Sequence, residues 1–200
     1  MQELLDGYRS FRSSLWPDLR RQHEDAAEAQ RPVALIIACA DSRVDPQRIF
    51  NAGPGRIFVI RNVANLVPPY EQGDGLHGTS AAIEFAVTKL EVPTILVLGH
   101  ARCGGVTAAL DRSIAADSEF IRPWISLLDP ALARIDANGD TQTALERESI
   151  LVSMERLEAF PFVARAISDR SLEVAGARFG IATGQLELYD KKTKTFQIVT

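Results

Sequence analysis

Three short apolar runs limit most strongly what this 200-residue chain can fold into. They are VALIIACA (33–40), RIFVIR (56–61) and TILVLG (94–99). A continuous apolar run of this length is typical of a strand buried on both faces of a parallel sheet. Residues 77–92, between the second and third runs, change to helical spacing. Strand, helix and strand in this order indicate a right-handed parallel α/β unit.

The rest of the chain predicts helices followed by strands. The expected helices run from Val106 to Leu110, from Ile121 to Ile135, and from about 142 to 168 with an interruption at Pro161. The stretches RSLEVAGARFG, QLELYD and TFQIVT indicate three further strands, with KKTK (191–194) as a hairpin turn. We therefore expect one α/β domain over 1–200, with a central, largely parallel sheet flanked by helices and antiparallel strands at the C-terminal end.

Residues 1–30 predict an amphipathic helical arm. Leu4, Tyr8, Phe11 and Leu15 follow helical spacing, and charged residues occupy the other side. Such an arm either closes the core of its own chain or packs on a second subunit. The sequence leaves both roles open.

Charge and hydropathy restrict the partners and the compartment. The chain has 22 basic and 26 acidic residues, a net charge of −4, so no overall positive field attracts nucleic acid or an anionic membrane. Residues 1–30 lack the features of a secretory signal. The longest apolar run, 33–40, is far shorter than the roughly 20 residues of a membrane helix. We expect a soluble, cytoplasmic protein that binds neither nucleic acid nor membranes.

Both cysteines follow predicted buried strands. Cys39 is the next to last residue of the first apolar run, and His100 and Cys103 follow the third within GHARCGG (99–105). The carboxyl ends of parallel strands form the edge of the sheet where ligands bind. Two thiols and an imidazole that converge there suit zinc. A disulfide between the two cysteines is the alternative.

The fourth position of such a zinc site is predicted to be open. There is no third cysteine, and His23 and His77 lie outside these strand ends, so water or hydroxide would complete the site as in catalytic zinc centres. Asp41 and Arg43 follow Cys39 closely. A carboxylate held by a two-pronged guanidinium can accept a hydrogen bond from zinc-bound hydroxide instead of binding the metal. The alternative is a surface ion pair of little energetic value.

Three motifs, in this order and spacing, resemble those of the β-class carbonic anhydrases. They are CADSRV (39–44), RNVANLVPP (61–69) and GHARCGG (99–105). The likeness is detailed from about Gln30 to Gly105 and looser to the end of the chain. It implies a zinc lyase, a carbonate dehydratase, that reversibly hydrates carbon dioxide to bicarbonate and a proton. It also implies one Zn²⁺ per subunit on Cys39, His100 and Cys103, with Asp41 and Arg43 as the catalytic pair.

The resemblance further implies a substrate pocket at a subunit interface, and hence a homodimer or a dimer of dimers (a tetramer). Gln30 matches the family's glutamine that hydrogen-bonds the substrate. The other expected substrate-binding residues are Phe58, Val63, Phe85 and Gly104. Ordinary core packing is the alternative for each of the apolar ones.

Some members of the family have a second, inhibitory bicarbonate site that uses a tryptophan three residues before the first zinc cysteine. This chain has Ile36 there, although Arg61 and Tyr189 resemble the other two residues of that site. We therefore expect the inhibitory site to be absent or weak.

Two other functions stay open at this point. A close relative of the family hydrolyses carbon disulfide or carbonyl sulfide with the same ligands, and the motifs do not separate these substrates from carbon dioxide. A non-catalytic module that binds zinc or bicarbonate is the third interpretation. The intact pair of Asp41 and Arg43 argues against that module.

Overall fold

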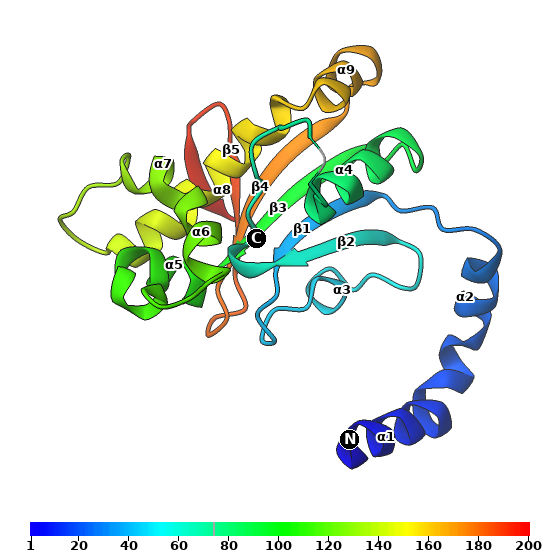
Figure 1. Ribbon diagram of the computed structural model, residues 1–200. Helices are drawn as coiled ribbons and strands as arrows, with labels where there is room; N and C mark the ends of the chain where they lie inside the picture. The colour runs from blue at the N-terminus through cyan, green and yellow to red at the C-terminus, as the bar shows by residue number, and fades with distance from the viewer. Residues whose placement is uncertain (74) are drawn as a thin grey trace.

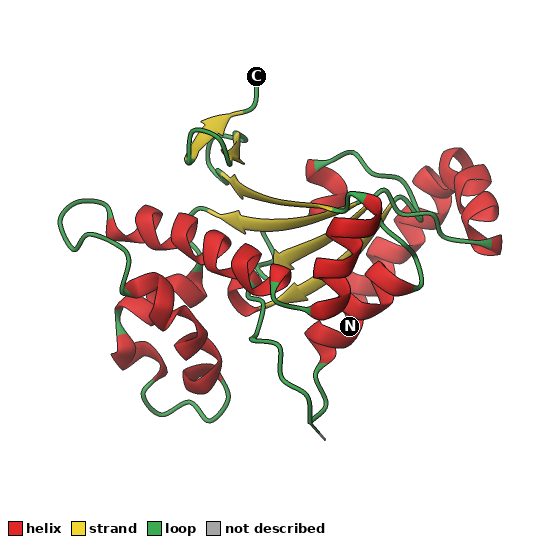
Figure 2. Cartoon of the chain, turned by 90° about the horizontal axis from the view of Figure 1, so that it is seen from above, coloured by secondary structure: helices red, strands yellow, loops and turns green. Residues whose placement is uncertain are grey.

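The computed structural model describes residues 1–73 and 75–200, and its centre is a six-stranded sheet of order β2-β1-β3-β4-β5-β6 (Figure 1). The strands are β1 (Ala34–Cys39), β2 (Ile57–Asn62), β3 (Thr94–His100), β4 (Glu173–Phe179), β5 (Leu186–Asp190) and β6 (Thr195–Ile198). The first four are parallel, and β5 and β6 are antiparallel. Figure 2 shows the β5–β6 hairpin at one end of the sheet. The predicted fold class is confirmed.

Helices connect the strands and precede the sheet. They are α1 (Gln2–Ser10), α2 (Trp16–Glu28), α3 (Pro46–Ile49), α4 (Gly78–Thr88), α5 (Gly104–Leu110), α6 (Ile121–Ile125), α7 (Asp129–Leu132), α8 (Thr141–Glu158) and α9 (Pro161–Arg170). A π-helical turn over Phe11–Leu15 joins α1 to α2, and 3₁₀ turns span Val63–Asn65, Arg112–Ala115 and Ser126–Leu128. In the part of the chain that the structure describes, none of these helices has the length and apolar character needed to cross a bilayer.

The predicted helix from Ile121 to Ile135 is wrong as one element. The structure has two short helices, α6 and α7, separated by a 3₁₀ turn. Pro130 lies in the first turn of α7. Because proline has no N–H to donate, it is tolerated at the start of a helix but interrupts one that continues through it. The predicted break at Pro161 is confirmed, since α9 begins there.

The two faces of the sheet are covered differently. Alternate residues of a strand point to opposite faces. Leu35 and Ile37 of β1 therefore belong to the largest buried cluster, against α4, α8 and α9, and Ile36 and Ala38 belong to a smaller cluster on the other face. That second face retains an open apolar groove of about 560 Å³, lined by residues of β1 to β5 and by the chain that follows α3.

The N-terminal arm runs away from the sheet (Figure 1). None of the residues of α1, the π-helical turn or α2 is buried. Leu4 is 72% exposed and Tyr8 is 59% exposed. The arm therefore does not close the core of its own chain, which leaves packing on a second subunit as the prediction.

Two glycines let α8 approach the sheet closely. A Cβ added at Gly99 would lie 2.7 Å from Cδ1 of Ile150, and one at Gly176 would lie 2.5 Å from Cγ2 of the same residue. Both glycines thus make room for one side chain of α8, and this fixes the height of the helix above β3 and β4.

We expect Gly176→Ala to lower the free energy of unfolding by about 1–3 kcal/mol, because the added methyl group overpacks the contact with Ile150. Urea unfolding at constant protein concentration measures the loss. Gly7→Ala is the control, since nothing lies within 4 Å of a methyl group at that position. Equal stability of the two variants would contradict the account of this contact.

Candidate metal centre

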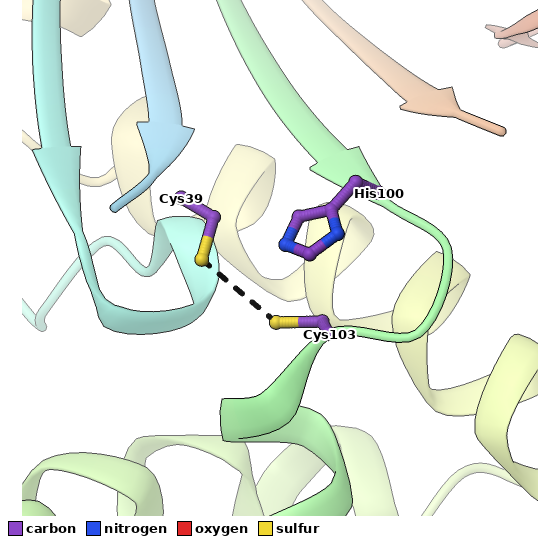
Figure 3. Close-up of side chains that lie close together, drawn as sticks. All are labelled: Cys39, His100 and Cys103. Carbon is purple, nitrogen blue, oxygen red and sulfur yellow. Dashed lines mark hydrogen bonds between the residues drawn. The ribbon is translucent and has the colours of Figure 1, made fainter. Parts of the chain in front are cut away.

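The three predicted ligands meet at the carboxyl edge of the sheet. Cys39 and His100 are the last residues of the neighbouring parallel strands β1 and β3, and Cys103 directly precedes α5. Figure 3 shows their side chains pointing toward one another. Their ligand atoms all lie within 4.8 Å of each other, and the two sulfur atoms are 4.0 Å apart. All three residues are buried.

This cluster fits a zinc ion. Tetrahedral zinc with Zn–S bonds of about 2.3 Å places two sulfur ligands about 3.8 Å apart, close to the observed separation. Nδ1 of His100 lies 2.9 Å from the carbonyl oxygen of Ala101. A carbonyl can only accept, so Nδ1 carries the proton and Nε2 keeps its lone pair. That Nε2 atom is buried and has no hydrogen-bond partner among the described residues, as expected of a metal ligand.

The pKa values of the two thiols are shifted in opposite directions. The hydrogen bond from Cys103 lowers the pKa of Cys39 to about 4, and the same hydrogen bond, together with burial, raises the pKa of Cys103. Burial alone would lower the pKa of His100, but the Cys39 sulfur, the Ala101 carbonyl and Asp41 outweigh it and raise that pKa. A dication bound between these groups would replace the protons that they hold.

The turn after β2 supplies a further donor to the first ligand. The backbone N–H of Ala64 donates to Sγ of Cys39 over 3.3 Å. Ala64 and Asn65 have φ angles of 64° and 49°, a left-handed conformation that is unfavourable for alanine and better tolerated by asparagine. The side chain of Asn62 holds this turn, because it accepts from the N–H and donates to the carbonyl of Leu66.

Asp41 lies beside the cluster and Arg43 fixes its orientation. Oδ1 of Asp41 accepts from the backbone N–H and from Nε of Arg43, both over 2.9 Å, and Oδ2 accepts from Nη2 over 2.7 Å. Oδ2 is also 3.9 Å from Nε2 of His100. The Arg43 hydrogen bonds hold the pKa of Asp41 well below its usual range, so the carboxyl group is ionised at neutral pH. The predicted pair is therefore present next to the ligands.

Arg61 holds the loop that carries these residues, a role that the sequence analysis missed. Its Nε donates to the carbonyl of Cys39 over 3.0 Å, and its Nη2 donates to the carbonyls of Asp41 and Val44 over 2.6 Å each. The register pairs Arg61 on β2 with Ala38 on β1. The sequence signal was the pair of apolar runs 33–40 and 56–61. Pairing these two predicted strands in parallel would have placed Arg61 beside the loop.

The predicted substrate-binding residues separate into two groups. Val63 precedes Ala64, the donor to Cys39, and Gly104 follows Cys103, so both lie at the metal centre. Phe58 pairs with Leu35, four residues before Cys39 and about 13 Å from it along the strand. Figure 1 places α4 and the start of β2 away from α5.

Neither Phe85 nor Gln30 lies at the metal centre: Phe85 packs on Phe58, and Gln30 lies beside Gly55, before β2. The rings of Phe85 and Phe58 stack with centroids 5.9 Å apart. Gln30 precedes β1, and Cys39 lies at the far end of that strand, which is itself roughly 17 Å long. One chain by itself does not bring these three residues to its own metal centre.

Arg61 and Tyr189, which resemble two residues of a second anion site, do not meet within one chain. Arg61 lies on β2 and Tyr189 on β5, and β1, β3 and β4 lie between them. Tyr189 instead packs against Phe196, with ring centroids 5.3 Å apart. Both Nε and Nη2 of Arg61 are already bound to backbone carbonyls.

The chain is similar to known proteins over most of its length. A family model described as carbonic anhydrase matches residues 34–186. A protein of Arabidopsis thaliana named beta carbonic anhydrase 3 is 33% identical over 204 residues, which cover 98% of this chain and 79% of that protein. The solved structure of the beta-carbonic anhydrase CcaA has a TM-score of 0.89 and 29% identity, and the match covers 100% of this chain and 99% of that chain. A structure from a study of two tetrameric beta-carbonic anhydrases of the ascomycete Sordaria macrospora has a TM-score of 0.66 and 29% identity, with 94% and 92% covered.

We expect the purified chain to hold about one zinc ion, and Cys39→Ser or Cys103→Ser to lose nearly all of it, because a hydroxyl is a much poorer zinc ligand than a thiolate. Elemental analysis measures the zinc content. His23→Ala, on the arm, is the control and should keep the metal. A wild-type chain without zinc, or a Cys39–Cys103 disulfide in its mass spectrum, would refute this prediction.

Proposed function

The chain belongs to the carbonic anhydrase family, in its β class, and we propose that Cys39, His100 and Cys103 hold the zinc ion of its reaction. It is a lyase that converts carbon dioxide and water reversibly to bicarbonate and a proton. The observation that carries the assignment is the Cys–His–Cys cluster at the edge of the sheet, beside a carboxylate held by an arginine. Zinc bound there supplies a Lewis acid that makes water nucleophilic near neutral pH.

Asp41 is assigned to orient the attacking water. Its Oδ2 atom faces the cluster, 3.9 Å from Nε2 of His100, and is free to accept one more hydrogen bond. Arg43 occupies the remaining acceptor positions of the carboxylate with three donors. This prevents Asp41 from rotating toward the ligands, so Arg43 acts as a positioning residue for Asp41.

We also infer that the working pocket is completed by a second copy of the chain. Gln30, Phe58 and Phe85 lie at the opposite end of the strands from the cluster, so a symmetric partner is the source that would bring such residues to the site. Phe85 is 45% exposed although it is apolar. A pocket with apolar walls suits carbon dioxide, which is linear and has no net dipole.

The arm and the open sheet face support this dimer. The arm exposes Leu4, Leu5, Tyr8 and Leu15, and an isolated helix gains stability chiefly by burying such a face. The apolar groove of about 560 Å³ on the less covered face of the sheet offers a surface of matching character. A homodimer, or the tetramer formed by two of them, would bury both surfaces.

A reducing compartment such as the cytoplasm fits the ligand set. Both cysteines are free thiols, and oxidation to a disulfide would remove two of the three ligands. The relatives described above are all named carbonic anhydrases, so they give no support to hydrolysis of carbon disulfide or carbonyl sulfide. The ionised Asp41 beside the ligands argues against a non-catalytic module.

We expect Asp41→Asn to keep its zinc but to hydrate carbon dioxide about 100-fold more slowly or worse, since the amide no longer offers a fixed anionic acceptor. Arg43→Ala should lose more activity, because the freed carboxylate can then bind the metal. Stopped-flow proton release and zinc content are measured together. Asp129→Asn, which breaks an exposed pair with Arg112, is the control. Full activity in either test variant excludes the assigned role.

A hybrid dimer tests whether Gln30 acts across the interface. Chains carrying Gln30→Ala and Asp41→Asn are co-expressed with different tags and the mixed dimer is purified. If Gln30 serves the partner's site, one of the two sites is intact, so about half of the wild-type activity returns. The matched control is a dimer of one chain that carries both substitutions and one wild-type chain. Activity no higher than the mean of the two parent variants would show that the pocket is not shared.

A further inference from the structure

A buried ion pair that the reaction does not use lies directly behind the metal centre. Glu146 on α8 is 2% exposed and Arg178 on β4 is 8% exposed. Removing a charge from water costs several kcal/mol unless good hydrogen bonds replace the lost hydration. The partners of this pair therefore indicate what holds it in place.

Both oxygens of the Glu146 carboxylate are held by neighbouring groups. Oε2 accepts a hydrogen bond from Nε of Arg178 over 2.8 Å and forms an ion pair with Nη2 of the same guanidinium, also at 2.8 Å. Oε1 accepts from Nε2 of Gln142 over 2.8 Å and from the backbone N–H of Cys103 over 3.2 Å. Because the Arg178 guanidinium holds Oε2 through one hydrogen bond and an ion pair, Oε1 is directed at the peptide N–H of the predicted zinc ligand Cys103.

The same peptide group is held from its other side. Its carbonyl oxygen is that of Arg102, which accepts from Nη2 of Arg43 over 3.1 Å. Arg102 has a φ of 55°, a conformation that costs about 1–2 kcal/mol for a residue with a side chain. Arg43 and Glu146 thus fix the two ends of one peptide plane in a strained turn. The orientation of that plane sets the direction of the Cys103 side chain.

We propose that Glu146 is a positioning residue for the zinc ligand Cys103 and acts through the backbone N–H of that ligand, with Arg178 fixing the carboxylate. The inference rests on the proposed function, because it requires zinc on Cys103. Replacing a residue that hydrogen-bonds a metal ligand typically lowers the metal affinity by about 10- to 100-fold.

Arg178 has other hydrogen-bond partners besides Glu146, so Glu146 can be replaced without leaving the guanidinium unpaired. Its Nη1 donates to Glu187 over 3.2 Å and its Nη2 to Thr143 over 3.3 Å. Neutralising Glu146 therefore leaves Arg178 with a carboxylate partner. We expect Glu146→Gln to fold, and circular dichroism verifies this.

Zinc release to a chromogenic chelator from the full, zinc-loaded chain is the test. In Glu146→Gln, the guanidinium of Arg178 attracts the amide oxygen, so the amide NH₂ meets the N–H of Cys103. We expect zinc affinity to fall about 10-fold or more. The sulfur-to-metal absorption band of the cobalt-substituted chain should shift as well. Glu155→Gln is the matched control, because Glu155 is also on α8 and pairs with Arg134 through both oxygens.

A second variant separates positioning from simple ion pairing. In Glu146→Gln/Arg178→Met the amide oxygen is free to turn back to the N–H of Cys103. We expect zinc affinity and the cobalt spectrum to recover toward wild type even though the ion pair is gone. A pair that only ties α8 to β4 gives no such recovery.

Each outcome decides the matter. Loss in Glu146→Gln beyond the Glu155→Gln control, followed by recovery in the double variant, supports the proposal. Zinc affinity equal to the control, or a loss that the double variant does not restore, overturns it while the proposed function stands. A wild-type chain that holds no zinc contradicts the proposed function itself, and this inference falls with it.

Discussion

Parallel pairing of β1 with β3 is the constraint on which the site depends. Because the two strands are neighbours and run in the same direction, their carboxyl ends bring Cys39 and His100 to one edge. The short turn after β3 then returns Cys103 to the same point, with the two sulfur atoms 4.0 Å apart. Burial of all three residues removes competing water. Two thiols and an unpartnered imidazole nitrogen in such a place are stabilised best by a metal ion.

The ligand loops themselves are irregular, and side chains from elsewhere hold them. Arg61 of β2 donates to three carbonyls of the loop after β1, and the strained turn at Ala64 supplies an N–H to the Cys39 sulfur. On the other side, Arg43 and Glu146 bind the two ends of the peptide before Cys103. Arg43 thus contacts both Asp41 and the ligand turn, which links the acceptor of the reaction to the geometry of the metal site.

The fold and the ligands could be predicted from the sequence because both follow from local patterns. Short apolar runs indicate the strands. The positions of Cys39 and His100 at the ends of two of these runs place both residues at the carboxyl edge of the sheet. Arg61 and Glu146 could not be assigned in this way. Glu146 is 43 residues from Cys103, and their contact depends on how closely α8 approaches β3 and β4, which Gly99 and Gly176 permit. The separation of Phe58 from the metal centre likewise follows from strand register.

The central claim is that this cluster hydrates carbon dioxide, and stopped-flow measurement of proton release on mixing with dissolved carbon dioxide tests it most directly. At pH 8.5 the account predicts a rate above that of buffer which rises in proportion to the zinc bound, across samples loaded to different extents. Carbonyl sulfide serves as the comparison substrate in the same samples. A rate no higher than buffer with a full complement of zinc, or turnover of carbonyl sulfide alone, would contradict the account.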